Sequence, residues 1–196
     1  MIRYIKDILD IKNVLGAQRP QPLPAYPAGQ TVFRNNNGSS VTIVPIYTGT
    51  MTIRYSSGGA TQIITHPGAD SGNTMTISSP DQGTDIVITG DLQQLTFNNN
   101  NVDFIAVGHT LSALRFYSGV KTLDLRNGTV SFMNYPPYGI ETLYAKATSS
   151  TMRNICTNII NNSSVTNGTL WIKSFETYAQ DVIAVAKAHG WKVYYL

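Results

Sequence analysis

The segment Leu92-Gln-Gln-Leu-Thr-Phe-Asn-Asn-Asn-Asn-Val-Asp-Phe-Ile-Ala-Val107 contains two copies of one pattern, apolar-x-x-apolar-x-apolar. Four more copies follow, and the six copies start 10, 9, 9, 10 and 10 residues apart. Taken in pairs they have a period of about 19–20 residues, which is in the range of leucine-rich repeats. The central apolar residues of the copies are Leu95, Ile105, Leu114, Leu123, Met133 and Leu143. Because one coil cannot bury its own apolar face, the repeat predicts a short leucine-rich-repeat-like solenoid with these side chains inside.

The sequence on either side of the repeat extends this prediction to a mainly β protein with an α/β cap. Downstream, apolar spacing predicts helices over 150–160 and 179–189, and strands over 169–172 and 191–196. Upstream, five short apolar or alternating runs between turn signals predict strands. These runs are 41–46, 51–55, 62–65, 74–77 and 85–89. We therefore expect a small β domain over 31–90 and the solenoid with its C-terminal cap over 91–196.

The N-terminus has a different pattern. Residues 1–18 predict an amphipathic helix, whose apolar stripe includes Ile5, Ile8, Leu9 and Leu15. Residues 19–30 contain four prolines, which predict an extended, semi-rigid linker of about 3 Å per residue. Two interpretations follow: the helix is an anchor held away from the body, or it folds back onto the body as a cap.

Composition excludes several classes of function. Only 13% of the 196 residues are charged, and the net charge of +3 is spread along the chain, so no basic tract indicates nucleic-acid binding. No run approaches the ~18 apolar residues of a membrane span. The single cysteine, Cys156, permits neither an intrachain disulfide nor a cysteine-based zinc site. Charges interrupt the apolar positions of the first ten residues, so no secretion signal is predicted.

The residues that commonly carry catalysis form no recognisable arrangement. His66, His109 and His189 lack metal-binding spacing, and Cys156 is on the apolar face of a predicted helix. The aspartates that could form a calcium site or a glycosidase pair are spaced without a known pattern. They are Asp81, Asp85, Asp91, Asp103 and Asp124. We therefore predict a protein that is not an enzyme, with no catalytic residue, no metal and no cofactor.

Aromatic residues are the more suggestive group. Tyr117, Tyr135, Tyr138 and Tyr144 occur within the repeat, together with many neutral amide side chains. Exposed aromatic rings among neutral amides are typical of surfaces that bind sugars or proteins. These four tyrosines are therefore a candidate ligand surface. The alternative is that their side chains pack in the core or fill space between the coils.

Two segments support a resemblance. Ile86-Val-Ile-Thr-Gly-Asp-Leu-Gln-Gln-Leu-Thr-Phe-Asn-Asn-Asn-Asn-Val102 resembles the repeat phrase of divergent leucine-rich-repeat proteins of gut Bacteroidetes. Asp181-Val-Ile-Ala-Val-Ala-Lys-Ala-His-Gly-Trp-Lys-Val193 is similar to their C-terminal strand. Phages of these bacteria carry similar modules on virion proteins, which need no signal peptide.

This resemblance, with the order helix, proline arm and β-rich head, implies a bacteriophage head fibre or capsid decoration protein. It would be located in the virion, attached by its N-terminus to capsid or other virion proteins, and we expect a homo-oligomer. The alternative is a surface or secreted adhesion module of a Bacteroidetes bacterium that binds a host glycan or surface protein. Neither hypothesis involves nucleic acid or a membrane.

Overall fold

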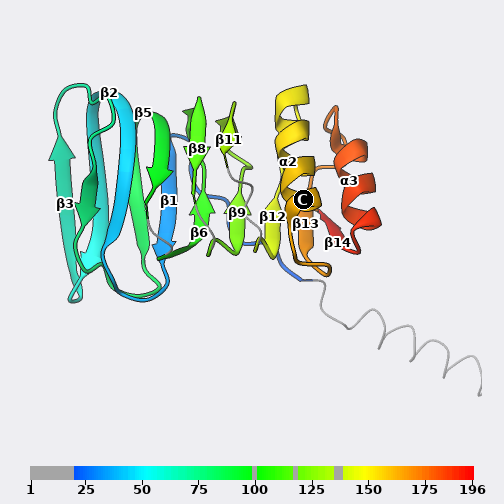
Figure 1. Cartoon of the computed structure of the whole chain (residues 1–196), viewed down its shortest axis with the longest axis horizontal. Coiled ribbons are helices and arrows are strands. Elements are labelled where there is room, and N and C mark those ends of the chain that lie inside the picture. The colour runs from blue at the N-terminus through cyan, green and yellow to red at the C-terminus, as the bar shows by residue number, and fades with distance from the viewer. Residues whose placement is uncertain (1–19, 99–100, 117–118, 135–138) are drawn as a thin grey trace, which may run out of the picture.

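The computed structural model describes residues 20–98, 101–116, 119–134 and 139–196 (Figure 1). Of these residues, 44% are in strands and 14% in helices, so the prediction of a mainly β protein is confirmed. The anchor residues Ile5, Ile8, Leu9 and Leu15 lie outside the described residues.

One large mixed sheet dominates the described part of the chain. Its N-terminal strands are β1 (Gln30–Asn35), β2 (Val41–Ser57), β3 (Ala60–His66), β4 (Met75–Ile77) and β5 (Asp85–Phe97). Its later strands are β6 (Val102–Ala106), β8 (Ala113–Arg115), β9 (Thr122–Asp124), β11 (Met133–Asn134), β12 (Thr142–Tyr144), β13 (Thr169–Ile172) and β14 (Lys192–Tyr195). Two further strands, β7 (Thr110–Leu111) and β10 (Thr129–Val130), pair separately in parallel.

The sheet is antiparallel at one end and parallel at the other. β1 lies between β5 and β6 and runs antiparallel to both. From β6 the strands β9, β12, β13 and β14 follow in parallel, in the same order as in the chain. β5 is long enough to pair with β2 along its length, with β1 by its first half and with β8 by its second half.

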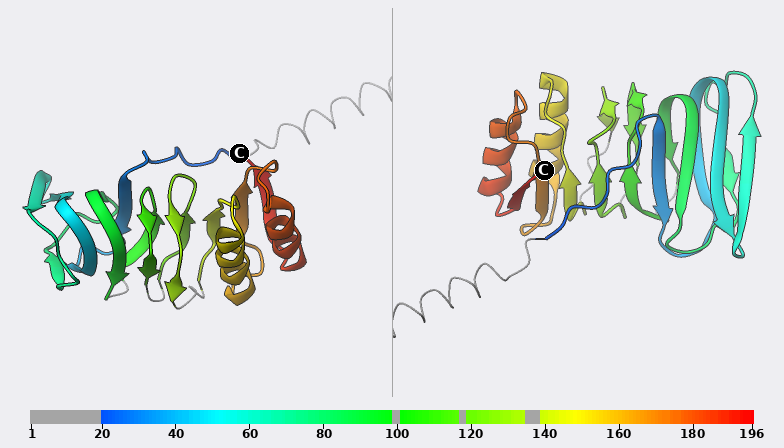
Figure 2. Two further views of the ribbon diagram at one scale, coloured as in Figure 1. Left: turned by 90° about the horizontal axis from the view of Figure 1, so that it is seen from above. Right: turned by 180° about the vertical axis from the view of Figure 1, so that it is seen from behind.

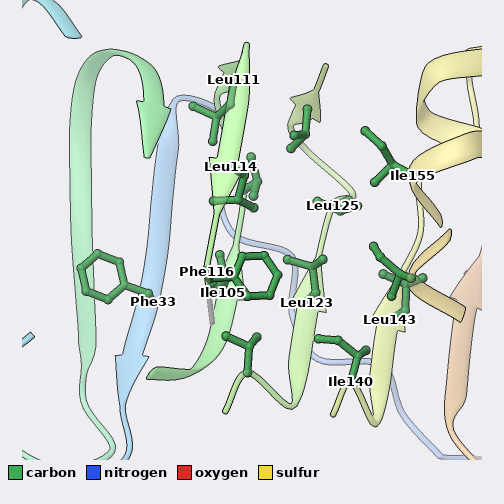
Figure 3. Packing of buried hydrophobic residues seen from close by; sticks show 14 of the residues in the cluster. Phe33, Ile105, Leu111, Leu114, Phe116, Leu123, Leu125, Ile140, Leu143 and Ile155 are labelled. Carbon is green, nitrogen blue, oxygen red and sulfur yellow. The ribbon is translucent and has the colours of Figure 1, made fainter. Parts of the chain in front are cut away.

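The six central residues of the repeat fall into two parallel series. Leu95, Leu114 and Met133 are register partners across β5, β8 and β11. Ile105, Leu123 and Leu143 are partners across β6, β9 and β12, and the series continues to Leu170 on β13. Five of the six side chains are fully buried and Met133 is partly buried, so alternate copies of the pattern supply opposite sides of one core (Figure 3).

The predicted boundary at residue 90 does not coincide with a break in the sheet or in the core. It falls inside β5, and the same core cluster runs from Phe33 on β1 to Trp191 beside β14. β1 explains the continuity, because it closes the gap between the antiparallel strands and the first parallel strand. The predicted strands 41–46 and 51–55 are likewise one strand, β2, which bends with a register shift between Thr48 and Met51.

Two helices close the core in the C-terminal part of the described chain. They are α2 (Ser150–Asn162) and α3 (Ala179–Ala188), close to the predicted helices. The Ser149 side chain caps α2 by accepting from the Met152 amide, and Met152, Ile155, Cys156, Ile159 and Ile160 form its buried stripe. Figure 2 shows both helices on one side of the sheet and residues 20–28 on the other.

Candidate functional site

The proline-rich segment is bound to the body of the protein along its length. Residues 20–28, here called the strap, run without helix or strand over the sheet face opposite the helices (Figure 2). The Leu23 amide donates to the Tyr144 hydroxyl (2.9 Å), and Asn127 donates through its side chain to the Tyr26 carbonyl. At the end of the strap, the Gly29 amide donates to the Gly108 carbonyl (2.7 Å). The backbone of the strap is extended, and its contacts hold residues 23–29 against the sheet. The helix of residues 1–18, for which the two interpretations were given, lies outside the described residues.

Arg126 supplies the strongest contacts of the strap. Its guanidinium donates to the carbonyls of Leu23 (2.8 Å) and Pro24 (3.2 Å). It also pairs with both carboxylate oxygens of Asp124, at 3.0 Å from Nε and 2.6 Å from Nη2. The two side chains are only 11% and 5% exposed, so each charge neutralises the other where water has little access.

Tyr144 lies beneath the strap and is not part of an exposed surface. The Arg126 guanidinium covers its ring at 4.2 Å from the centroid, and Trp171 stacks on it at 6.0 Å with an interplanar angle of 8°. Tyr144 is 3% exposed, which corrects its assignment to the ligand surface. It faces outward from the repeat, but the strap fills the space above it. Tyr117, Tyr135 and Tyr138 lie outside the described residues.

A second polar cluster holds the other end of the strap. The Tyr26 hydroxyl donates to Asp85 (2.9 Å), whose carboxylate also binds Arg34 (2.7 Å). The ring of Tyr26 packs on Phe104 at 5.5 Å between centroids. Burial, with a smaller effect of the Asp85 charge and hydrogen bond, raises the pKa of Tyr26. The strap is therefore fixed by aromatic and ionic contacts near both ends.

Two adjoining hollows lie between this end of the strap and the β2–β3 hairpin. Their volumes are about 340 and 210 Å³, and both are lined by Gln30, Arg54 and Val87. The larger hollow also contacts Tyr26, Tyr55, Ser56, Thr61 and Asp85, and the smaller one contacts Thr52, Ile63 and Thr89. Hydroxyl, amide and guanidinium groups can bind a polar ligand, but Asp85 is the single carboxylate in this lining and is already paired with Arg34.

Two of the titratable residues singled out from the sequence, Asp81 and Cys156, have structural contacts. Asp81 accepts from the amides of Gly58 (2.7 Å) and Gly59 (2.9 Å) and so closes the β2–β3 turn. Burial raises the pKa of the Cys156 thiol to about 12, which leaves it a poor nucleophile. Within the described ranges, no group of three or more His, Cys, Asp or Glu side chains could hold a metal ion.

His109 joins three parts of the fold. Its Nδ1 lies 2.8 Å from the Thr31 hydroxyl and its Nε2 lies 2.8 Å from the Gly90 carbonyl. Burial lowers its pKa, and this effect outweighs the opposing effects of the Gly90 carbonyl and the Asp91 charge. The neutral imidazole is therefore the form that fits the folded protein.

We expect acid to weaken the fold through His109. Because the folded-state pKa lies below the ordinary value of 6.5, the unfolded chain binds the proton more readily. Stability contributed by this residue is then complete above pH 6.5 and is lost as the pH falls below that value. Denaturant unfolding between pH 7.5 and 5 measures the loss, and His109→Gln is expected to flatten the curve. An unchanged slope in that variant would contradict the assignment.

Sequence reasoning missed Arg126 and Asn127, although both follow the strand that bears Asp124. The one available signal was Asp124-Leu-Arg126, a charge pair two residues apart at the end of an apolar triplet. Nothing in that spacing indicates a partner about a hundred residues earlier in the chain.

Comparisons with known proteins identified no relative of this chain. No family model matched the chain, and no match was found among curated proteins or solved structures. Among the described residues, no helix is long and apolar enough to cross a membrane. The arguments below therefore rest on the geometry of the strap and the sheet.

Proposed function

We propose that this chain is a non-enzymatic structural or binding protein of a bacteriophage virion, a head fibre or decoration protein. Residues 1–18 attach it to capsid or other virion proteins, and the β-rich body faces outward. The observation that carries the proposal is the strap, because its contacts with Tyr144, Arg126 and Asn127 fix where the N-terminal segment leaves the body.

The exit point supports an attachment role. The start of the strap lies at the end of the sheet that carries β12 and β13, opposite β3 (Figure 2). An attachment segment that leaves from a fixed place orients the body on its support, whereas a segment on a free linker does not. The apolar stripe of Ile5, Ile8, Leu9 and Leu15 supplies a docking surface of the kind that an amphipathic helix buries on a partner.

We also infer that residues 91–196 form a short leucine-rich-repeat-like solenoid with α2 and α3 in its cap. The parallel registers of Leu95 with Leu114 and of Ile105 with Leu123 support this inference. α2 follows the second ladder along the core, where its Met152 sulfur accepts from the Val130 amide (3.4 Å). Such a body suits a static, outward-facing module.

Deleting residues 1–18 tests the attachment role. The strap residues 20–28 and all their contacts remain, so we expect the truncated chain to stay folded, with an unchanged circular dichroism spectrum. It should no longer join particles when it is produced together with a capsid protein that incorporates the full-length chain. The matched full-length variant replaces Ile5, Ile8, Leu9 and Leu15 by serine and should fail in the same way. Normal incorporation of either variant would refute the anchor.

The hollows beside Arg54 favour a second candidate, a surface or secreted adhesion module that binds a host glycan or surface protein. Their hydroxyl- and amide-rich lining, with Arg54 in both, suits a polar ligand. A glycan array probed with the intact chain and with Arg54→Ala distinguishes this candidate, because binding that depends on Arg54 is not expected of a purely structural protein.

A further inference from the structure

β3 is an outermost strand whose outer edge has no protection. Among the described strands it pairs with β2 alone, and it lies at the extreme end of the sheet (Figure 1). Natural edge strands are normally blocked by charged side chains, proline or a bulge. Ala60-Thr-Gln-Ile-Ile-Thr65 has none of these, and Ile63 at its centre is 65% exposed.

The register of the hairpin determines which backbone groups are free. Gly58 and Gly59, both with positive φ, form a two-residue turn, so the flanking pair Ser57 and Ala60 is hydrogen-bonded. Along the β2–β3 hairpin, residue pairs that share backbone hydrogen bonds then alternate with non-hydrogen-bonded pairs. The N–H and C=O groups of Thr61, Ile63 and Thr65 therefore point away from β2, toward the open edge.

We propose that a second copy of this chain pairs with that edge, β3 antiparallel to β3 about a two-fold axis through Ile63. In this register Ile63 faces Ile63 of the other copy, and Thr61 faces Thr65. Each of these is a pair in which both residues direct their N–H and C=O groups outward, so every free group on the edge finds a partner. The exposed Ile63 side chains meet on the axis and shield each other from water.

Charge is compatible with this symmetric pairing. The axis brings Ile63 opposite its own copy, so a charge at that position would face an identical charge, and β3 has no Lys, Arg, Asp or Glu. The nearest cation is Arg54, the β2 partner of Ile63. Its symmetry mate would be three strand spacings away, about 14 Å, which is beyond the Debye length of about 8 Å in physiological salt.

The pairing is independent of the proposed virion role. β3 and the start of the strap lie at opposite ends of the sheet, so a dimer formed through β3 does not cover the strap. A second copy supplies an uncharged edge of the same length, so the two edges match from Thr61 to Thr65 and no charge is buried between them.

Ile63→Lys in the full-length chain tests the interface. The side chain is exposed, so the variant should fold normally, but two lysines would meet on the axis. Light scattering after size-exclusion chromatography should show a molar mass half that of the parent. Gln62→Lys is the matched control: it places the same charge on the same strand, away from the axis and opposite Ile64, so the parent mass should be retained. A monomeric parent, or a mass unchanged by Ile63→Lys, would overturn the proposal.

Cross-linking gives an independent measurement. Ile63→Cys places one accessible thiol at the axis, whereas the native Cys156 is buried and contributes little background. A short bismaleimide should convert this variant to covalent dimers. Gln180→Cys, on the exposed side of α3, should stay uncross-linked. Equal cross-linking of the two variants would show random collision and would count against the interface.

Discussion

Replacing Gly90 by alanine is expected to destabilise the protein by roughly 2–6 kcal/mol. Gly90 has φ of 108°, a region in which side chains are strained, and it lies where β5 crosses from one half of the sheet to the other. A Cβ atom there would be 2.2 Å from the Thr50 carbonyl oxygen and 3.1 Å from the Met51 Cα. Both obstacles are backbone atoms of β2, so no side-chain rotation relieves them.

Gly83→Ala separates the effect of the strained backbone from the effect of the steric clash. Gly83 also has a positive φ, of 72°, but a Cβ atom added there would have nothing within 4 Å, so only the backbone strain applies. That variant should lose about 1 kcal/mol. Urea unfolding of both proteins, followed by circular dichroism, measures the difference. Equal losses would mean that the clash at Gly90 is relieved by movement of β2.

The repeat was predictable because its signal is local and is repeated six times. Five of the six triplets have Leu or Ile at the central position and the other has Met133, and Leu114 and Leu123 are buried as that periodicity requires. The two helices were predictable for the same reason, since each has an apolar stripe at helical spacing. The division at residue 90 was inferred from a change of pattern along the chain, which cannot indicate that β1 pairs with both β5 and β6 and so joins distant segments.

The site was less predictable than the fold. Proline spacing correctly indicates an extended backbone for the strap, but it does not indicate what that backbone contacts. The contact requires Arg126, whose importance depends on the burial of Asp124 and on the ring of Tyr144 beside it. A tyrosine in a repeat is equally compatible with an exposed ligand surface and with a surface covered by another segment, and only the three-dimensional path of residues 20–28 decides between them.

Arg126→Ala is expected to release the strap and to lower stability by about 3–5 kcal/mol. The substitution removes the donors to the carbonyls of Leu23 and Pro24 and leaves the Asp124 carboxylate without its cation at 5% exposure. Lys121→Ala is the control, because the Lys121–Glu141 pair is 62% and 54% exposed and should contribute less than about 1 kcal/mol. Denaturant unfolding measures stability, and hydrogen exchange of the Leu23 and Gly29 amides measures strap docking.

A double variant distinguishes loss of the strap from the penalty of an unpaired charge. Arg126→Met with Asp124→Leu removes both charges, and replacing a buried ion pair by apolar groups is often neutral for stability. We therefore expect the double variant to recover most of the lost stability. The Leu23 amide should still exchange faster than in the parent, because the guanidinium that held its neighbouring carbonyls is gone. If exchange at Leu23 returned to the parent rate, the other contacts of the strap would be sufficient to hold it, and Arg126 would serve only to neutralise Asp124.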